Sequence, residues 1–470
     1  MKAKAILFAS GSLLVVPACN NNMTQEQESP MNVIYILADD LGYGDLSCYG
    51  QQKFLTPNID RMAAEGMLFT QHYAGCTVSA PSRASLMTGL HTGHTQIRGN
   101  REICPEGQEP MDEGTFTIGK LMQEAGYTTG IFGKWGLGYP GSVSVPCTMG
   151  FDEFYGYNCQ RQAHSYYPSH LWHNDQKILF PENDNRGRVA YSQDIIHKQA
   201  LQFIKNNKDK PFFAMLTYTL PHAEMNLPHD SIYQQFENSF EETPYDGIQG
   251  YTPVDKPKAT FAAMVTRLDM YVGEVITELK MLGLDKNTIV FFASDNGPHR
   301  EGGATPDFFQ SYGSLKGTKR DLYEGGIRVP FIAWSPQKIA AGSKSDHVGA
   351  FWDMMPTLSE LTGTDLAVET DGVSLLPTLF SRGEQKEHDY LYWEFHEMGG
   401  RQALLSGNWK LIRQPIVGET ILELYDLSHD LHEDNNLAAQ RLEKVKELEA
   451  LMDNARTESP LFNFGRKTKN

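Results

Sequence analysis

Four continuous apolar runs in this 470-residue chain constrain its fold most strongly, because each is short and bounded by polar residues. The runs span Asn32–Ala38, Tyr127–Phe132, Pro211–Thr219 and Thr288–Ala293. Apolar runs without polar alternation predict strands that are covered on both faces, as in a mostly parallel sheet packed between helices. Helical patterns lie between the runs, at Thr115–Ala125, Asp194–Lys205 and Thr260–Leu282. The sequence therefore predicts an α/β sandwich around a central, mostly parallel sheet.

Polar residues suited to chemistry follow each of these strands. They are Asp39-Asp40, Lys134, His222 and Asp295-Asn296, in strand order. In open α/β sheets, sites gather at the carboxyl edge of the strands. Adjacent buried carboxylates are costly unless a cation neutralises them, and hard oxygen ligands indicate calcium or magnesium. We predict one site with a cation and several basic groups; a solvated acidic turn is the alternative for Asp39-Asp40.

The segment Ser79-Ala80-Pro81-Ser82-Arg83 precedes helix-forming residues. Pro81 suits a first helical turn, which places Ser79 at a helix N-terminus, where backbone N–H groups favour an anion. Arg83 lies one turn further along, on the same face. The segment predicts a nucleophile that faces a sulfate or phosphate; an ordinary helix cap is the alternative.

Further basic residues are candidates for substrate contacts. His94 and Arg98 follow the Ser79 helix in a loop, and His164 lies in the aromatic stretch between Phe151 and Trp172. That stretch predicts either a sugar-binding platform or a packed insertion. Lys316 occupies a loop flanked by glycines.

The N-terminus has the pattern of a targeting segment. Basic residues precede an apolar core at Ala5–Val16, which is too short to span a membrane. Val16-Pro17-Ala18-Cys19 resembles a lipobox, which predicts residues 1–19 as a lipoprotein signal peptide and Cys19 as the lipidated residue; a plain cleaved secretory signal is the alternative. Residues 20–30 form a polar tether. We expect an exported protein, in the periplasm or outer membrane of a Gram-negative bacterium, that contacts membrane only through its anchor.

The net charge of −17 argues against a nucleic-acid partner, which favours a basic surface. After Gly363 the pattern changes to short strands with turns between them, followed by an amphipathic helix at Leu442–Ala455. We therefore predict a catalytic domain at 31–363 and a smaller α+β subdomain with an antiparallel sheet at 364–470.

Several ordered motifs resemble those of the formylglycine-dependent sulfatases. They are Asp39–Asp45, Ser79–Arg83 with Leu86–Gly89, Gly133-Lys134-Trp135, Ser294–Gly297, Gly325–Pro330 and Trp409-Lys410-Leu411. The resemblance spans the whole mature chain and is to serine-type bacterial carbohydrate sulfatases, similar to arylsulfatases and N-acetylgalactosamine-6-sulfatases. It implies an alkaline-phosphatase-like fold and hydrolysis of sulfate esters on sugars such as galactose or N-acetylgalactosamine. The implied partners are a sulfated mono- or oligosaccharide and an anaerobic sulfatase-maturating enzyme.

The resemblance also assigns roles to residues. Ser79 becomes formylglycine (3-oxoalanine), whose hydrate attacks sulfur, and His222 protonates the departing sugar oxygen. Arg83, Lys134 and Lys316 hold the nucleophile and the sulfate. One Ca²⁺ is implied at Asp39, Asp40, Asp295 and Asn296. Substrate contacts are expected from His94, Arg98 and His164.

One position departs from the family pattern. Many sulfatases have Gly-Lys-Trp-His-Leu-Gly, whereas Gly136 replaces the histidine here. The base for sulfate elimination is then unassigned, with His91 or His94 as substitutes. Two alternatives to a sulfatase are a metal-dependent phosphatase or phosphodiesterase that uses unmodified Ser79, and an inactive surface-anchored glycan-binding protein.

Overall fold

The computed structural model describes Met1 and residues 30–464. The predicted signal peptide and Cys19 lie outside these residues. Among the described helices, none is both long and apolar enough to cross a membrane.

An eleven-stranded sheet forms the centre of the described chain, in the order β12-β2-β11-β10-β1-β9-β5-β6-β7-β8, with β13 beside β2. The four predicted strands are neighbours in its middle and run parallel. They are β10 (Thr288–Ser294), β1 (Asn32–Ala38), β9 (Phe212–Thr217) and β5 (Thr128–Lys134). The prediction of a buried parallel sheet is confirmed, and all four carboxyl ends meet at one edge.

Further strands extend this sheet on both sides. On one side lie β11 (Arg328–Trp334), β2 (Met67–Tyr73), β12 (Ser343–Ser345) and β13 (Gly349–Ala350); on the other lie β6 (Glu153–Tyr157), β7 (His170–His173) and β8 (Gln176–Leu179). The β11 strand is antiparallel to both β10 and β2. The sheet is therefore mixed at its margins and parallel at its centre.

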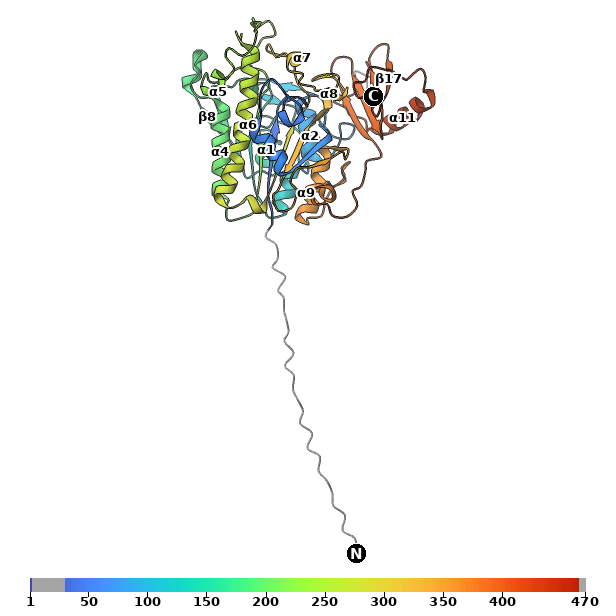
Figure 1. Ribbon diagram of the computed structural model, residues 1–470, viewed down its shortest axis with the longest axis horizontal. Helices are drawn as coiled ribbons and strands as arrows, with labels where there is room; N and C mark the ends of the chain where they lie inside the picture. The colour runs from blue at the N-terminus through green and yellow to red at the C-terminus, as the bar shows by residue number, and fades with distance from the viewer. Residues whose placement is uncertain (2–29, 465–470) are drawn as a thin grey trace.

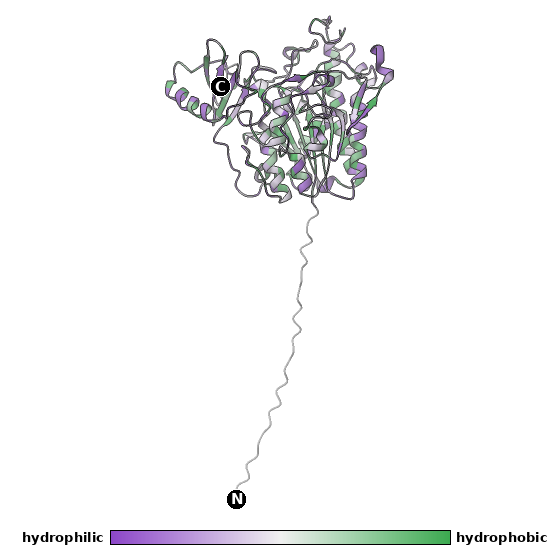
Figure 2. Cartoon of the chain, turned by 180° about the vertical axis from the view of Figure 1, so that it is seen from behind, coloured by the Kyte–Doolittle hydropathy of each residue, from purple (hydrophilic) through white to green (hydrophobic). Residues whose placement is uncertain are grey.

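Helices cover both faces of the sheet (Figure 1). One face packs against α1 (Pro57–Glu65), α4 (Ser192–Asn206) and α6 (Pro257–Leu282), and the other against α2 (Ser79–Thr88), α3 (Ile118–Glu124) and α9 (Met354–Thr362). Alternate residues of β1 divide between the two cores, with Ile34 and Ile36 on one side and Val33 and Tyr35 on the other. The hydrophobic strands stand out at the centre of Figure 2.

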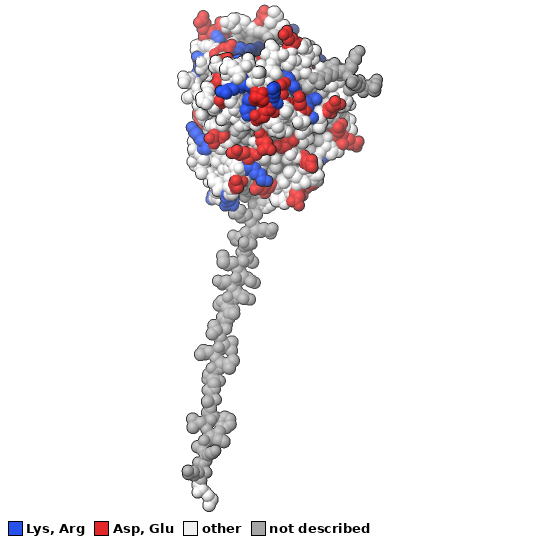
Figure 3. Space-filling view, turned by 90° about the vertical axis from the view of Figure 1, so that its right-hand side faces the viewer, with Lys and Arg blue, Asp and Glu red and all other residues white. Residues whose placement is uncertain are grey.

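The C-terminal region forms a four-stranded antiparallel sheet, as predicted. Its strands are β14 (Leu391–Phe395), β15 (Arg401–Ser406), β16 (Trp409–Gln414) and β17 (Ile421–Asp426), and α11 (Leu442–Asn454) packs on one face. The other face contacts the main domain, where Trp393 packs with Tyr73 and Trp352. Figure 3 shows this side of the molecule, with acidic side chains spread over the surface and basic ones between them.

Short elements complete the described chain. They are β3 (Glu102–Ile103), β4 (Gly107–Gln108), α5 (Ser231–Gln234), α7 (Pro306–Phe309), α8 (Glu324–Ile327) and α10 (Leu376–Phe380). The loops at the carboxyl edge of the main sheet connect several of these elements and surround the site described next.

Candidate active site

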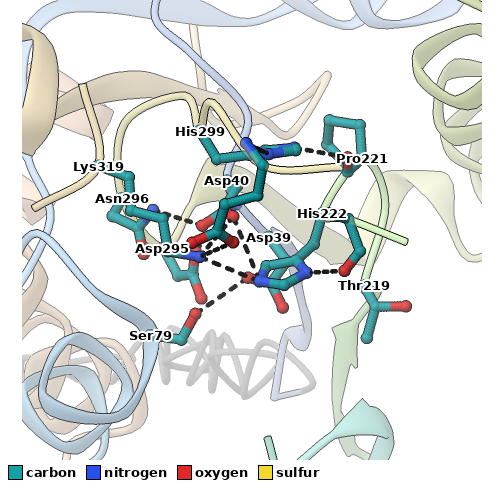
Figure 4. A network of polar contacts seen from close by, with 12 residues as sticks. Asp39, Asp40, Ser79, Thr219, Pro221, His222, Asp295, Asn296, His299 and Lys319 are labelled. Atoms are coloured by element: carbon teal, nitrogen blue, oxygen red, sulfur yellow. Dashed lines mark hydrogen bonds and ion pairs between the residues drawn. The ribbon is translucent and has the colours of Figure 1, made fainter. Parts of the chain in front are cut away.

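The ends of β1 and β10 bring four oxygen-bearing side chains together. Ala38 pairs with Ser294, so Asp39 and Asp40 lie beside Asp295 and Asn296. The Asp40 N–H donates to Asp295 Oδ1 (3.1 Å), and Asn296 Nδ2 donates to Asp40 Oδ1 (2.6 Å). The backbone of Asp40 is left-handed (φ 61°), an uncommon conformation for a residue other than glycine. The predicted clustering of these residues is confirmed (Figure 4).

Ser79 is the first residue of α2 and points at this cluster. Its Oγ donates to Asp39 Oδ1 (3.0 Å), and Lys134 Nζ lies 3.2 Å from the same Oγ. Lys134 also contacts Asp39 Oδ2 at 2.5 Å, the geometry of a charge-assisted pair. The side chain of Ser79 is therefore fixed between a carboxylate and an ammonium.

Arg83 lies one helical turn after Ser79 and holds the carboxylates together. Its Nε and Nη2 donate to Asp295 Oδ2 at 3.0 and 2.9 Å, and Nη2 lies 3.4 Å from Asp39. Its Nη1 donates to the carbonyl oxygen of Lys134 (2.8 Å). Arg83 is 2% exposed, so it positions the two carboxylates from the interior of the protein.

His222 and Lys319 also contact the cluster (Figure 4). Lys319 Nζ donates to Asp40 Oδ2 (2.8 Å) and lies 3.0 Å from His222 Nε2. His222 Nδ1 contacts the carbonyl oxygen of Ala223. Because a carbonyl only accepts, we assign the hydrogen of neutral His222 to Nδ1, which leaves Nε2 as an acceptor facing Lys319. Burial and the nearby Lys319 hold the pKa of His222 well below its usual value.

Lys316, the predicted sulfate ligand, lies elsewhere, and Lys319 takes the position expected for it. Lys316 Nζ donates to the carbonyl oxygen of Glu433 (2.7 Å) and lies over the rings of Tyr323 and Tyr425. The chain turns at Gly317, which has a left-handed backbone (φ +91°), so two lysines three residues apart point to different regions. Lys319 lies in the same loop as Lys316, so the sequence placed a lysine at this site but not the correct one.

Burial and charge act against each other within the cluster. Burial alone would raise the pKa of Asp39, but the positive charges of Lys134 and Arg83 outweigh it and hold that pKa well below its usual range. Burial and repulsion from Asp39 raise the pKa of Asp295 to about 6. The cluster holds three buried carboxylates and three buried cations, so its formal charge is balanced. These are Asp39, Asp40, Asp295, Arg83, Lys134 and Lys319.

The donor set fits a hard divalent cation. Asn296 Oδ1 is buried and has no hydrogen-bond partner among the described residues, although Asn296 Nδ2 has two acceptors. Three carboxylates converge beside it without exposure to solvent. Carboxylate and amide oxygens are the ligands that calcium and magnesium prefer.

A second group of metal-ligand type, Asp40, His299 and Glu301, adjoins the first. The ammonium of Lys319 lies between two of its members, 2.8 Å from Asp40 and 3.4 Å from Glu301. A cation therefore already bridges these carboxylates. This arrangement disfavours the two-metal phosphatase alternative.

A cavity of about 470 Å³ opens above Ser79. It is lined by Ser79, Asn100, Glu102, Gln108, Gln160, Arg161, His164, His222, Tyr251, Glu301, Lys319, Arg320 and Glu397. His164 stacks on His222 with ring centroids 4.6 Å apart, so this candidate contact does lie at the site. Glu301, Arg320, Tyr251 and Glu397 were missed, because they come from loops without a motif.

His94 lies outside this cavity. Its Nδ1 is 2.9 Å from Asp371 Oδ1, and its ring stacks on His91 at 4.4 Å. His91 is likewise directed to Asp371, whose carboxylate accepts the His91 backbone N–H (2.9 Å). Neither histidine lines the Ser79 cavity, so the structure does not support them as substitutes for the missing histidine at position 136.

Gly136 has a left-handed backbone (φ +76°), and its missing side chain leaves room for Gln160. A Cβ at this position would lie 2.2 Å from Gln160 Nε2. That amide donates to the Gly136 carbonyl oxygen (3.3 Å) and lines the cavity. Gln160 therefore occupies space that a larger residue at position 136 would need, which the sequence pattern alone did not predict.

The aromatic stretch is a packed insertion. Tyr155, Tyr157 and Tyr166 are at most 5% exposed and belong to the core of one sheet face. Arg161 and His164 of the same segment do reach the cavity. Of the two alternatives for this stretch, the burial of its tyrosines favours the packed insertion, and the segment still contributes polar groups to the site.

Arg98 is part of an internal ion-pair network and does not line the cavity. Its Nη1 donates to Glu394 Oε1 (2.9 Å), and Arg456 Nε donates to Glu394 Oε2 (2.7 Å). Glu394 is fully buried in β14, so the network joins the C-terminal sheet to the loop after α2. Glu394 lies 296 residues from Arg98 in the sequence, so the sequence alone did not identify it as the partner of Arg98.

We expect Arg98→Met to lower the free energy of unfolding by about 3 kcal/mol, because it leaves a buried carboxylate short of a partner. Arg101→Met is the control, since Arg101 is half exposed and its ion pair with Glu109 should contribute less than about 1 kcal/mol. Urea unfolding followed by circular dichroism measures both variants. A loss of turnover with unchanged stability would instead place Arg98 in substrate binding.

A buried nucleophile candidate at a helix N-terminus, beside oxygen ligands at the edge of a parallel sheet, defines the class of an α/β hydrolytic enzyme. The family model described as Sulfatase matches residues 31–364, and the model described as N-sulphoglucosamine sulphohydrolase, C-terminal, matches residues 317–458. The chain belongs to the sulfatase family, whose members use formylglycine and a metal ion, and it has the alkaline-phosphatase-like fold of that family.

Relatives and solved structures agree with this assignment. N-acetylgalactosamine-6-sulfatase of Mus musculus is 30% identical over 432 residues, covering 86% of this chain and 76% of the relative. N-acetylgalactosamine-6-O-sulfatase of Bacteroides thetaiotaomicron is 28% identical and covers 95% of this chain and 97% of the relative. A Bacteroides thetaiotaomicron sulfatase from a locus for glycosaminoglycan metabolism superimposes with a TM-score of 0.75 at 28% identity, covering 92% of this chain and all of that chain. The structure of Ps i-CgsB in complex with k-i-k-neocarrahexaose superimposes with a TM-score of 0.74 at 27% identity, covering 90% of this chain and 93% of that chain.

Proposed function

We propose that this sulfatase hydrolyses sulfate esters of saccharides that contain galactose or N-acetylgalactosamine. The observation that carries the proposal is the position of Ser79, held between Asp39 and Lys134 at the floor of a polar cavity. A cavity of about 470 Å³ has the size of a small-molecule site. The names of the relatives in mouse and Bacteroides thetaiotaomicron support the choice of sugar.

We propose that Ser79 is converted to formylglycine, which requires an anaerobic, serine-type maturating enzyme. The hydrated aldehyde would supply the nucleophilic oxygen. Asp39 accepts a hydrogen bond at this position and Lys134 lies on its other side, so both groups would orient that oxygen. Arg83 holds Asp39 and Asp295 in place and thereby acts as a positioning residue.

Lys319 and His222 are proposed to serve the sulfate and the leaving group. The ammonium of Lys319 lies between Asp40 and His222, where it can donate to an oxygen of bound sulfate. His222 Nε2 accepts a hydrogen bond from Lys319 and faces the same space, so it can pass a proton from that ammonium to the departing sugar oxygen. His164 stacks on His222 and limits the positions that its ring can adopt.

We propose Ca²⁺ as the metal, held by Asp39, Asp40, Asp295 and Asn296. The unpartnered Asn296 Oδ1 supports this set. When bound, the ion would neutralise carboxylate charge and attract the sulfate. With three carboxylates already balanced by three cations, an added divalent ion leaves an excess of positive charge that suits an anionic substrate.

The test uses protein co-expressed with a serine-type maturase and measures anion release from galactose and N-acetylgalactosamine carrying sulfate at position 4 or 6. We expect sulfate release from at least one ester, about 10³-fold less activity after chelation, and recovery with calcium. The same sugars carrying phosphate are the control. Phosphate release with zinc, and none of sulfate, would contradict the proposal and favour the phosphatase.

We further propose that the protein is an exported lipoprotein of a Gram-negative bacterium, divided into a catalytic domain at 31–363 and a subdomain at 364–470. The Val16–Cys19 motif supports the first proposal, and the two separate sheets support the second. Mass analysis of the mature N-terminus distinguishes a lipidated Cys19 from plain cleavage.

A further inference from the structure

The Ser79 cavity continues into two others along one side of the molecule. It shares Tyr251 with a second cavity of about 450 Å³. The second cavity shares Arg188, Asn226 and Pro253 with a third of about 280 Å³. Tyr251 separates the first two, with its hydroxyl donating to Glu301 (3.0 Å) and its ring 5.8 Å from that of His164. The three cavities are adjacent because they share these lining residues, and together they are called the groove.

Charge is distributed unequally along this groove. Within the Ser79 cavity the basic side chains are paired with carboxylates, as in Arg161 with Glu102 (2.8 Å) and Arg320 with Glu301 (2.6 Å). In the second cavity, Arg186 and Arg188 are exposed, and neither forms an ion pair with a described residue. The acidic residue there, Glu224, accepts a hydrogen bond from Asn226 (3.0 Å). Its two arginines outnumber its one carboxylate, so the lining of the second cavity carries a net formal charge of +1.

The loop that carries these arginines is fixed by Asn183. The buried amide of Asn183 donates to the carbonyl oxygens of Pro168 and Ala190, both at 2.9 Å. Its Oδ1 accepts the N–H groups of Val189 (3.1 Å) and Ala190 (2.9 Å). Both arginines thus lie on a loop that is held by the hydrogen bonds of Asn183. This lowers the conformational entropy that the loop loses when a ligand binds.

We propose that the second cavity binds an anionic substituent, a sulfate ester or a carboxylate, on the sugar next to the one being hydrolysed. The natural substrate is then an oligosaccharide with at least two anionic groups that extends past Tyr251. This inference rests on the proposed function and deepens it. Arginine suits both anions because its guanidinium donates two parallel hydrogen bonds.

The test compares three disaccharides that share the same reacting sulfated residue and differ in its neighbour, which is neutral, sulfated or a uronate. For the wild type we expect kcat/KM about tenfold higher with an anionic neighbour than with the neutral one. In Arg186→Ala/Arg188→Ala this ratio falls to about one, mainly through KM. If the sulfated neighbour gives the higher kcat/KM, the bound anion is a sulfate ester. If the uronate neighbour does, the bound anion is a carboxylate.

Arg382→Ala is the matched control, because Arg382 is exposed and lines none of the three cavities, and it should keep the ratio. A wild-type ratio near one, or a double variant that keeps the wild-type ratio, would overturn the inference. Calorimetry with Ser79→Ala protein needs no turnover: the added arginine changes should weaken binding of the disulfated disaccharide about tenfold. Unchanged binding there overturns the inference, whereas weakened binding without turnover by the matured enzyme contradicts only the proposed reaction.

Discussion

Ser79→Ala is expected to lower kcat for sulfate release by about 10⁴-fold or more, because it removes the group that becomes the nucleophile. Peptide mass spectrometry of matured wild-type protein should show a loss of about two mass units at Ser79, from oxidation of the hydroxyl to an aldehyde. The variant should lack this change. Its fold should persist, since only the hydrogen bond to Asp39 and the one from Lys134 are lost.

The matched control is Ser85→Ala in the same helix. Ser85 Oγ donates to the carbonyl oxygen of Leu90 (2.6 Å), away from Asp39, so turnover should fall little. Wild-type protein that hydrolyses sulfate esters with an unmodified serine would contradict the formylglycine proposal. An unaltered kcat in Ser79→Ala would remove Ser79 from the mechanism altogether.

Lys319→Met and Lys316→Met are expected to have opposite signatures. Lys319→Met should lower kcat/KM by about 10²- to 10³-fold, because it removes the ammonium between Asp40 and His222. Lys316→Met should leave turnover within about threefold and lower the free energy of unfolding by about 1 kcal/mol, through its contacts with Glu433 and Tyr323.

Steady-state kinetics of the Lys319→Met and Lys316→Met proteins measures kcat/KM, and urea unfolding measures their free energy of unfolding. Calcium affinity of Lys319→Met, followed by calorimetry, separates loss of a sulfate contact from collapse of the metal site. If Lys316→Met lost activity and Lys319→Met kept it, the sequence-based assignment of Lys316 would stand and the structural one would be wrong.

The fold was predictable because its core strands are local features of the sequence. A run such as Asn32–Ala38 is apolar at every position, which identifies a strand buried on both faces before any partner is known. The mixed margins of the sheet were less visible. Strand β12, for example, has only three residues, none of them buried, and depends on pairing with β2.

The site was predictable to the extent that its residues follow those strands. Asp39 and Asp295 end neighbouring parallel strands, so their meeting follows from the sheet. Residues in loops were less predictable, because the position of a residue along a loop does not determine where its side chain points. Arg98 and His94 follow the nucleophile helix closely, yet Glu394 and Asp371, nearly three hundred residues away, determine where they point.

The balance of three buried carboxylates by three buried cations bears on the order in which the enzyme is assembled. Small zinc-dependent domains fold only when their metal ion is bound. Here Arg83, Lys134 and Lys319 already neutralise Asp39, Asp40 and Asp295. We therefore expect the chain to fold without the metal ion and to remain folded but inactive until a divalent cation binds.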